Sequence, residues 1–238
     1  PTPCRASTMR VDLALRDTDQ TPGLLGHIQG RGVDSVRWAL RSLHHRSRRT
    51  VLTTAYGTDV DQFGELRLAA GESSQPVVVL LHGGFWRSRW QLDLMDALAV
   101  DLAERGFASW NVEYRRPDVH RWSDTVDDVL AGTRHIAELA QELPLDVGRL
   151  ALVGHSAGGQ LAAQAARALH AAPGLRPRIV VQLAGLVDLV ETHRRDIGNG
   201  AVPSALGGSP DQIPGTYASA SPMCRPAVGS DQLVVVGR

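Results

Sequence analysis

The sequence contains no lysine, and all 25 of its basic residues are arginines. The lysine-dependent phosphate loop GxxxxGK[ST] is therefore absent, and the dinucleotide-binding pattern GxGxxG does not occur either. The formal net charge is zero, but residues 1–50 carry 9 arginines against 4 aspartates, while residues 51–238 carry 16 arginines against 21 acidic residues. Because tracking a phosphate backbone needs a net-basic domain, the acidic main body argues against a nucleic-acid-binding protein.

Cysteines and long apolar runs are also scarce. The two cysteines, Cys4 and Cys224, lie far apart and outside any metal-ligand spacing, which argues against a disulfide framework and against a zinc site. No apolar run approaches the roughly 18 residues of a membrane span, and the N-terminus lacks the apolar core of a signal peptide. We therefore expect a cytoplasmic protein with no membrane partner and no bound metal.

Residues 1–48 are a separate segment to which no domain is assigned. Val33, Val36, Leu40 and Leu43 recur at helical spacing, which predicts one short amphipathic helix. Such a helix most often packs against the neighbouring domain. The other residues of the segment are polar and interrupted by glycines.

From residue 49 onward, strand and helix patterns alternate in what we interpret as one domain. The predicted strands are apolar or alternating runs at residues 50–56, 63–68, 77–81, 107–112, 150–153, 179–183 and 232–236, the first two as antiparallel edge strands. The predicted helices cover residues 93–105, 123–141 with Ser123 as N-cap, and 156–170. Residues 198–226, rich in proline and glycine, predict an irregular loop. This alternation is typical of an α/β fold with a mostly parallel, doubly wound sheet.

The strongest chemical signal is the sequence GHSAG at residues 154–158, directly after an apolar strand and before an Ala-rich helix. This G-x-S-x-G pattern is typical of a nucleophile elbow, in which a serine is held in a strained turn. Small residues are needed at Gly154 and Gly158 because strand and helix pass close together there. The helix N-terminus directs its dipole at Ser156, which makes this serine the candidate nucleophile. A turn that merely changes the chain direction is the alternative.

A second signal is HGGFW at residues 82–86, immediately after the strand VVVLL. An oxyanion hole needs backbone N–H donors with nothing bulky in front of them, and paired glycines allow that approach. The N–H groups around Gly83, Gly84 and Phe85, together with that of Ala157, are the candidate donors. A plain glycine turn is the alternative interpretation of this motif.

HGGFW and GHSAGG, with the strand-end sequence VEYR at residues 112–115 between them, resemble the α/β-hydrolase fold. Within that fold the chain is similar to hormone-sensitive-lipase-like esterases and especially to the kynurenine formamidase (arylformamidase) family, whose oxyanion motif is HGG-x-W. The resemblance covers about residues 50–238. It implies Ser156 as nucleophile and an oxyanion hole formed by Gly83, Gly84, Phe85 and Ala157.

The chain departs from the family in its proton relay. In that fold the triad acid and then the histidine follow the later strands, in the order serine, acid, histidine. Here the strand expected to precede the acid is at residues 232–236, and no histidine follows His193. We therefore expect a fold that is incomplete at its C-terminus, before the last strand and helix, with the acid and the histidine beyond Arg238.

Residues within the sequence offer substitutes for the missing acid and base. Asp188 ends the strand after the elbow helix, where some lipases place the acid, although a strand-end aspartate more often caps a turn. His193 follows five residues later. His155 is adjacent to the serine, but neighbours on an elbow project apart, and His82 is better suited to brace the oxyanion turn by hydrogen bonds.

Together these observations predict a serine hydrolase that cleaves small carboxylic esters or aryl formamides through an acyl-enzyme on Ser156, with no metal or organic cofactor. The expected partner is a small-molecule ester or amide, and the oligomeric state stays open, a homo-oligomer included. A non-catalytic binding protein of the same fold, lacking the acid and histidine, is the alternative. The substrate pocket lies in loops that the motifs do not determine.

Overall fold

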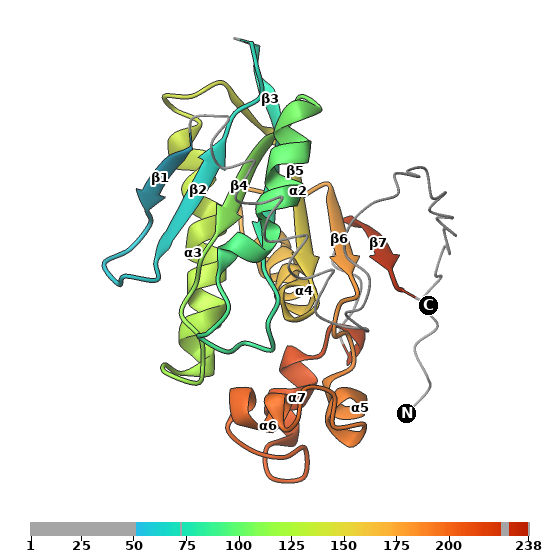
Figure 1. Ribbon diagram of the computed structural model, residues 1–238. Helices are drawn as coiled ribbons and strands as arrows, with labels where there is room; N and C mark the ends of the chain where they lie inside the picture. Colours follow the sequence, from blue (N-terminus) through green and yellow to red (C-terminus); the bar gives the residue numbers. More distant parts are fainter. Residues whose placement is uncertain (1–50, 72, 225–228, 238) are drawn as a thin grey trace, which may run out of the picture.

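The computed structural model describes residues 51–71, 73–224 and 229–237 (Figure 1). The helix predicted around residues 33–43, and with it the unassigned segment 1–48, lies outside the described residues. The described chain forms one sheet with helices on both faces (Figure 1). No helix in these three ranges is long and apolar enough to cross a bilayer.

Seven strands pair in the order β1-β2-β4-β3-β5-β6-β7. The pairs β1·β2 and β2·β4 are antiparallel, and the other four pairs are parallel. The strands are β1 (Leu52–Ala55), β2 (Phe63–Arg67), β3 (Gln75–Leu81), β4 (Ala108–Val112), β5 (Leu145–His155), β6 (Ile179–Leu183) and β7 (Asp231–Val235). This confirms the predicted α/β class, with a mostly parallel sheet and an antiparallel strand pair at one edge.

Helices cover both faces because the central strands are apolar on both sides. Val77, Val79 and Leu81 of β3 face the larger core, to which α3 and α4 contribute, whereas Val78 and Leu80 face a smaller core closed by α2. The helices are η1 (Leu92–Met95), α2 (Asp96–Glu104), α3 (Trp122–Leu139), α4 (Ala157–His170), α5 (Leu189–Arg194), α6 (Ala201–Leu206), α7 (Pro214–Ala220) and η2 (Pro222–Cys224).

The start of α3 differs from the expectation. Its N-cap is Arg121 and not Ser123, which lies exposed in the first turn. The carboxylate of Asp124 accepts a hydrogen bond from the Arg121 backbone N–H at 3.0 Å and pairs with the Arg121 guanidinium at 2.9 Å. An acidic residue at the third helical position can thus supply the cap that the sequence pattern assigned to serine.

The sequence predicts an irregular loop at residues 198–226, but the described part, residues 198–224, is largely helical, with α6, α7 and η2 gathered near the carboxyl ends of the strands (Figure 1). The prolines of this segment do not prevent helix formation, because Pro203 and Pro214 lie in the first turns of α6 and α7. A backbone N–H in a first turn has no intrahelical partner, so proline loses no hydrogen bond there. Val202 and Tyr217 are buried against the larger core and anchor these short helices. We call residues 187–224 the cap segment.

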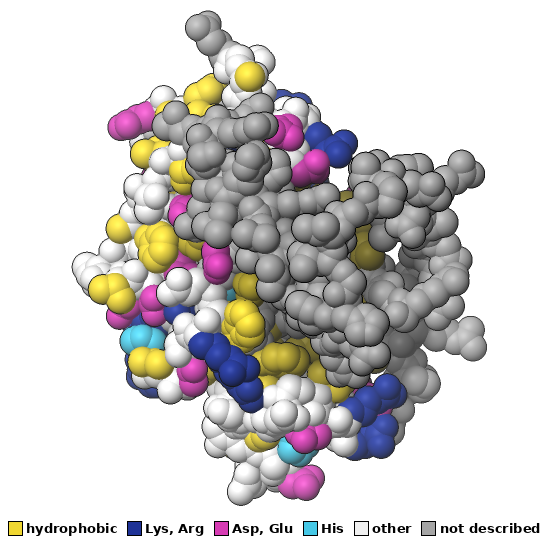
Figure 2. Space-filling view, viewed as in Figure 1, with side chains coloured by type: hydrophobic (Ala, Val, Ile, Leu, Met, Phe, Trp, Pro, Cys, Tyr) yellow, Lys and Arg dark blue, Asp and Glu magenta, His cyan; other side chains and the backbone are white. Residues whose placement is uncertain are grey.

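Acidic and arginine side chains are interspersed over the described part of the face shown in Figure 2. This part of the surface therefore carries no broad patch of one sign, such as the one that phosphate tracking requires.

Candidate active site

Ser156 joins the end of β5 to the start of α4 in a strained conformation. Its φ of 53° and ψ of −116° lie where residues with a side chain are seldom found, at a cost of about 1–3 kcal/mol. The Ser156 N–H donates to the carbonyl of Leu183 at 2.8 Å, and its carbonyl accepts from Gly159 at 2.9 Å. The neighbouring strand and the first turn of α4 therefore hold the turn that the motif predicts.

The two motif glycines are required by close backbone contacts. A Cβ at Gly154 would lie 2.1 Å from the carbonyl oxygen of Gly158, and a Cβ at Gly158 would lie 2.1 Å from that of Leu81. Because these obstacles are backbone atoms, the neighbours cannot move aside as a flexible side chain would. Strand and helix can pass this closely only with glycine at both positions.

The loop after β3 lies directly against the serine. A Cβ at Gly83 would be 3.1 Å from Ser156 Cβ, so the backbone of Gly83 faces the serine side chain. Among the described residues, no acceptor binds the backbone N–H groups of Gly83, Gly84 or Phe85. Ala157 is the first residue of α4, so its N–H has no intrahelical partner. Gly83 and Ala157 therefore bring unused N–H donors from two segments next to Ser156, and Gly84 and Phe85 follow directly in the loop.

This loop, residues 82–92, contains three consecutive residues with positive φ. They are Gly84 at 109°, Phe85 at 55° and Trp86 at 54°. Trp86 is buried, and its ring packs edge-on against Trp122 with centroids 5.8 Å apart. Trp86 therefore packs beneath the loop and holds a conformation that would be unfavourable for a free chain.

His82, at the start of the loop, is fully buried and braces it, as expected. Its Nε2 is 3.0 Å from Glu113 Oε1, and its Nδ1 is 2.8 Å from the carbonyl of Gly83. The ring stacks on Tyr114, whose hydroxyl donates to the His82 carbonyl at 2.7 Å. With both ring nitrogens engaged and the ring buried, His82 has no contact with Ser156 through which to exchange a proton.

Electrostatics keep the Glu113 carboxyl ionised. Burial alone would raise its pKa, but the hydrogen bond from His82 and the charges of His82 and Arg116 hold the pKa below its ordinary value. Burial has the opposite effect on His155, whose pKa it lowers, so that imidazole is neutral at pH 7. Burial also raises the pKa of Tyr114, which stays protonated and able to donate.

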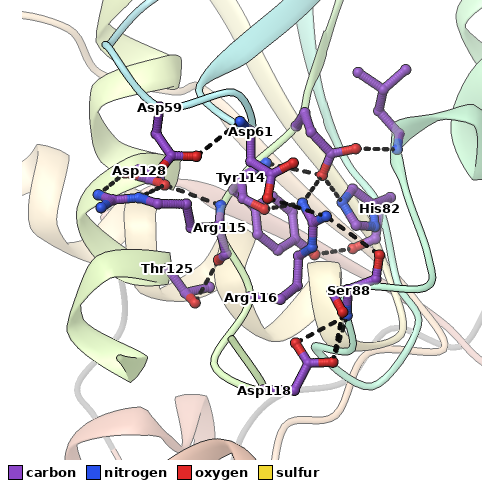
Figure 3. Close-up of polar contacts among 12 residues, drawn as sticks. Asp59, Asp61, His82, Ser88, Tyr114, Arg115, Arg116, Asp118, Thr125 and Asp128 are labelled. Atoms are coloured by element: carbon purple, nitrogen blue, oxygen red, sulfur yellow. Dashed lines mark hydrogen bonds and ion pairs between the residues drawn. The ribbon is translucent and has the colours of Figure 1, made fainter. Parts of the chain in front are cut away.

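Arg116 and Asp118 reach the middle of the loop from the segment after β4 (Figure 3). The Arg116 guanidinium pairs with Glu113, lies 3.5 Å from Asp61, and donates to the carbonyl of Ser88 at 3.4 Å. The Asp118 carboxylate accepts from the Ser88 N–H at 2.8 Å and from its hydroxyl at 2.9 Å. Side chains from a neighbouring strand end thus fix the loop between its two termini.

Arg87 ties the same loop to the cap segment. Its guanidinium donates to the carbonyls of Gly198 at 2.7 Å and Asn199 at 3.1 Å. A Cβ at Gly198 would lie 2.5 Å from the Phe85 ring, so the loop and the cap segment are in tight contact at Phe85.

The substitute acid and bases occupy other roles. Asp188 caps α5 by accepting from the Glu191 N–H at 3.0 Å, and His193 packs edge-on against Tyr217 with ring centroids 6.2 Å apart. The His155 ring lies against the loop, with its Nδ1 2.9 Å from the position of a Cβ at Gly83. No hydrogen bond joins the Ser156 hydroxyl to another residue in the described ranges. The predicted nucleophile and donors therefore come together, whereas the acid and base candidates do not join them.

Sequence reasoning missed the residues that shape the loop, namely Glu113, Arg116, Asp118 and Arg87. One signal was available, since the buried strand β4 is followed at once by an acid and, two residues later, by two arginines. Charged side chains at the end of a buried strand need hydrogen-bond or ion-pair partners. The end of the neighbouring parallel strand is where such partners lie.

Asp59, Asp61 and His120 are a group in the described ranges that could hold a metal ion, with ligand atoms within 4.8 Å of one another. Arg116 lies 3.5 Å from Asp61, and the Asp59 carboxylate also accepts from the Asp61 N–H. The aspartates thus already have partners, and we assign the group no role in the chemistry at Ser156.

Comparison with known families agrees with this geometry. The family model BD-FAE matches residues 66–225, more than half of the chain. The chain belongs to the BD-FAE family. Relatives and solved structures of esterases share the α/β-hydrolase fold, which confirms the predicted resemblance to that fold and to its esterases.

Two curated relatives come from Mycobacterium tuberculosis. Esterase LipI is 34% identical over 113 residues, which are 47% of this chain and 34% of LipI. Carboxylesterase NlhH is 38% identical over 109 residues, which are 45% of this chain and 33% of NlhH. The matched part of this BD-FAE protein thus spans about a third of the length of these relatives.

Two solved structures show the same fold. Esterase LipW from Mycobacterium marinum superposes with a TM-score of 0.63 at 21% identity, covering 78% of this chain and 65% of LipW. Carboxyl esterase 2 from Tuber melanosporum gives a TM-score of 0.66 at 18% identity, covering 79% of this chain and 67% of that one. At such low identity the similarity is one of fold.

Proposed function

We propose that this BD-FAE protein is a serine hydrolase that cleaves small carboxylic esters through an acyl-enzyme on Ser156. The observation that carries the proposal is the juxtaposition of a strained serine at a helix N-terminus with backbone N–H groups that no described acceptor uses. A reacting carbonyl between the two would meet its nucleophile and its donors together.

In this mechanism the Ser156 hydroxyl attacks the ester carbonyl, and the carbonyl oxygen becomes an oxyanion. Two or three of the candidate N–H groups, those of Gly83, Gly84, Phe85 and Ala157, donate to that oxygen, and the dipole of α4 adds to the stabilisation. The alcohol leaves, and water then attacks the acyl-enzyme to release the acid. A general base must take the proton of the Ser156 hydroxyl and return it to the leaving alcohol, and none of the described residues is hydrogen-bonded to that hydroxyl to do so.

Aryl formamides are a second substrate class, favoured by one feature of the loop. Its Trp86 matches the HGG-x-W motif of the kynurenine formamidase family that the chain resembles, and the tryptophan packs beneath the loop rather than projecting into the solvent. The non-catalytic binding protein is the alternative, supported by the lack of a described hydrogen-bond partner for the Ser156 hydroxyl.

Labelling with a fluorophosphonate tests the proposal. We expect slow labelling of Ser156 alone, because no described base activates it, and faster labelling when free imidazole is added as an external base. Mass spectrometry locates the label, and Ser156→Ala is the control. Label on another serine, or none on Ser156 at any imidazole concentration, would overturn the nucleophile assignment and leave the binding protein as the better reading.

Substrate class is then tested by comparing nitrophenyl acetate with N-formylkynurenine, each against Ser156→Ala. Preferential turnover of the ester supports an esterase, and preferential turnover of the formamide supports an arylformamidase.

A further inference from the structure

One buried carboxylate contacts both ends of the loop 82–92. Glu113 directly follows β4, and because β4 and β3 are parallel neighbours with Val112 opposite Leu81, it lies beside His82. Its Oε1 is 3.0 Å from His82 Nε2, and its Oε2 accepts from the Leu92 N–H at 2.9 Å. The side chain is 0% exposed. The two oxygens therefore join the first and last residues of the loop.

A third connection runs through Arg116. Its guanidinium pairs with Glu113 and also donates to the Ser88 carbonyl, in the middle of the loop, at 3.4 Å. The start, middle and end of the loop are thus linked to one buried ion pair. Charge-assisted hydrogen bonds of this kind are stronger than those between neutral groups and direct the geometry more closely.

We propose that Glu113 is a positioning residue whose carboxylate clasps the two ends of the loop and so aims its N–H groups at Ser156. The inference rests on the proposed role of this loop as the oxyanion hole. Glu113 has no contact with Ser156 and takes no part in bond making. It acts through His82 and Leu92.

The conformation of the loop explains why its two ends must be held by Glu113. Phe85 and Trp86 have positive φ, and each such residue costs on the order of 1–3 kcal/mol, so the surroundings must hold them in place. Donors of an oxyanion hole are effective only within a few tenths of an ångström of their working positions. Without the clasp, the loop would relax toward more common backbone angles and its donors would move away from the serine.

Asp128 provides a matched control for the buried charge. It is as buried as Glu113 and pairs with Arg115 at 2.7 Å, but its other partners are Gln62 and the Arg115 backbone, all outside the loop. Asp128→Asn therefore removes a buried, arginine-paired carboxylate without touching residues 82–92.

The test is hydrogen exchange of residues 83–92, measured by mass spectrometry in the full chain and in Glu113→Gln. Glutamine keeps the size but presents one oxygen and one NH₂ group, so either His82 or Leu92 loses its acceptor. We expect exchange in the loop to be about tenfold faster or more. Asp128→Asn should leave loop exchange unchanged.

Two outcomes would overturn the proposed role of Glu113. The first is equal hydrogen exchange of the loop in Glu113→Gln and in the wild type. The second is exchange that is accelerated in Asp128→Asn as much as in Glu113→Gln, which would indicate a general loss of stability. If Glu113→Gln does not fold, His82→Leu removes the side-chain contact between Glu113 and the start of the loop and leaves the contact with Leu92. Faster exchange in the loop of that variant supports the clasp, and unchanged exchange contradicts it.

Kinetics separate the clasp from the proposed function. With nitrophenyl acetate we expect kcat to fall in Glu113→Gln while KM stays within about twofold, because misplaced donors weaken binding of the transition state rather than of the substrate. A rise in KM alone would contradict the positioning role. If the wild type shows no turnover above Ser156→Ala and its Ser156 also takes no fluorophosphonate label in the presence of imidazole, the proposed function fails, and loop exchange still decides whether the clasp exists.

Discussion

The two segments that meet at Ser156 keep their shapes by different means. The elbow of residues 154–158 is shaped by backbone atoms of β5, α4 and the end of β3, which approach within 2.1 Å of where side chains would begin. The loop of residues 82–92 is shaped by side chains from elsewhere in the chain, among them Glu113, Arg116 and Trp122.

This difference shows where each segment is vulnerable. The elbow requires that residues 154 and 158 have no side chain, so adding a Cβ at either position should strongly destabilise the fold. The loop depends on contacts with residues 20 or more positions away in sequence, so it can be loosened from outside without altering any of its own residues. We expect changes in the elbow to affect folding first and changes around the loop to affect activity first.

The largest effect is expected for Gly154→Ala. The added Cβ would lie 2.1 Å from the carbonyl oxygen of Gly158, and relief requires moving β5 away from α4. We expect a loss of about 3 kcal/mol or more in the free energy of unfolding, or no folded protein. Urea denaturation followed by circular dichroism measures it.

Gly215→Ala in α7 is the matched control for that change. No atom lies within 4 Å of its added Cβ, and its φ is not positive, so alanine should be neutral or stabilise by about 0.5–1 kcal/mol. If Gly154→Ala behaved like this control, the backbone of the elbow would be more adaptable than the contacts indicate.

Gly84→Val is the corresponding change in the loop. Its φ of 109° excludes a branched residue, and its Cβ would lie 2.5 Å from Trp90. Because a displaced donor typically costs a hundredfold or so in turnover, we expect about that loss with nitrophenyl acetate in a form of the protein that has its acid and histidine, and a smaller effect on stability than for Gly154→Ala. Turnover near the wild-type rate would make HGGFW a structural turn only.

Arg87→Ala should separate the loop from the cap segment. Removing the hydrogen bonds to the carbonyls of Gly198 and Asn199 should cost about 1–2 kcal/mol locally. We expect faster proteolytic cleavage near residues 195–200, measured by time-course digestion. Arg89→Ala is the control, because the Arg89 guanidinium lies over the Trp90 ring, 5.4 Å from its centroid, and makes no hydrogen bond to the described residues of the cap segment. Equal cleavage rates in the two variants would contradict a stabilising contact between Arg87 and the cap segment.

The smallest effect is expected from pH. Because the folded pKa of Glu113 lies below its ordinary 4.5, its contribution to stability is complete above that pH and is lost as pH falls through the lowered folded value. The free energy of unfolding, measured by urea titration between pH 7 and pH 3, should fall less steeply in Glu113→Gln than in the wild type. Parallel curves would show that the carboxyl is not held ionised by His82 and Arg116.

Much of the architecture could be predicted from local patterns. The strands β3, β4, β6 and β7 contain the predicted apolar runs, and the elbow is a five-residue motif in the right context. The sequence pattern predicts only residues 150–153 of the strand β5, which extends over Leu145–His155. The cap segment could not be predicted in this way. Its short helices are stabilised by burying Val202 and Tyr217 against the core, while its prolines and glycines locally favour loops.

The amino-acid sequence by itself determined the α/β alternation, the candidate nucleophile and the glycines that allow strand and helix to meet, because periodicity and the absence of a side chain are local properties. Only the tertiary structure decided which charged residues hold the loop. Glu113 lies 31 positions after His82 and 21 after Leu92, and a strand pairing brings all three together. A buried carboxylate is stable only among partners that such a pairing supplies, and those partners are set by the register of the sheet.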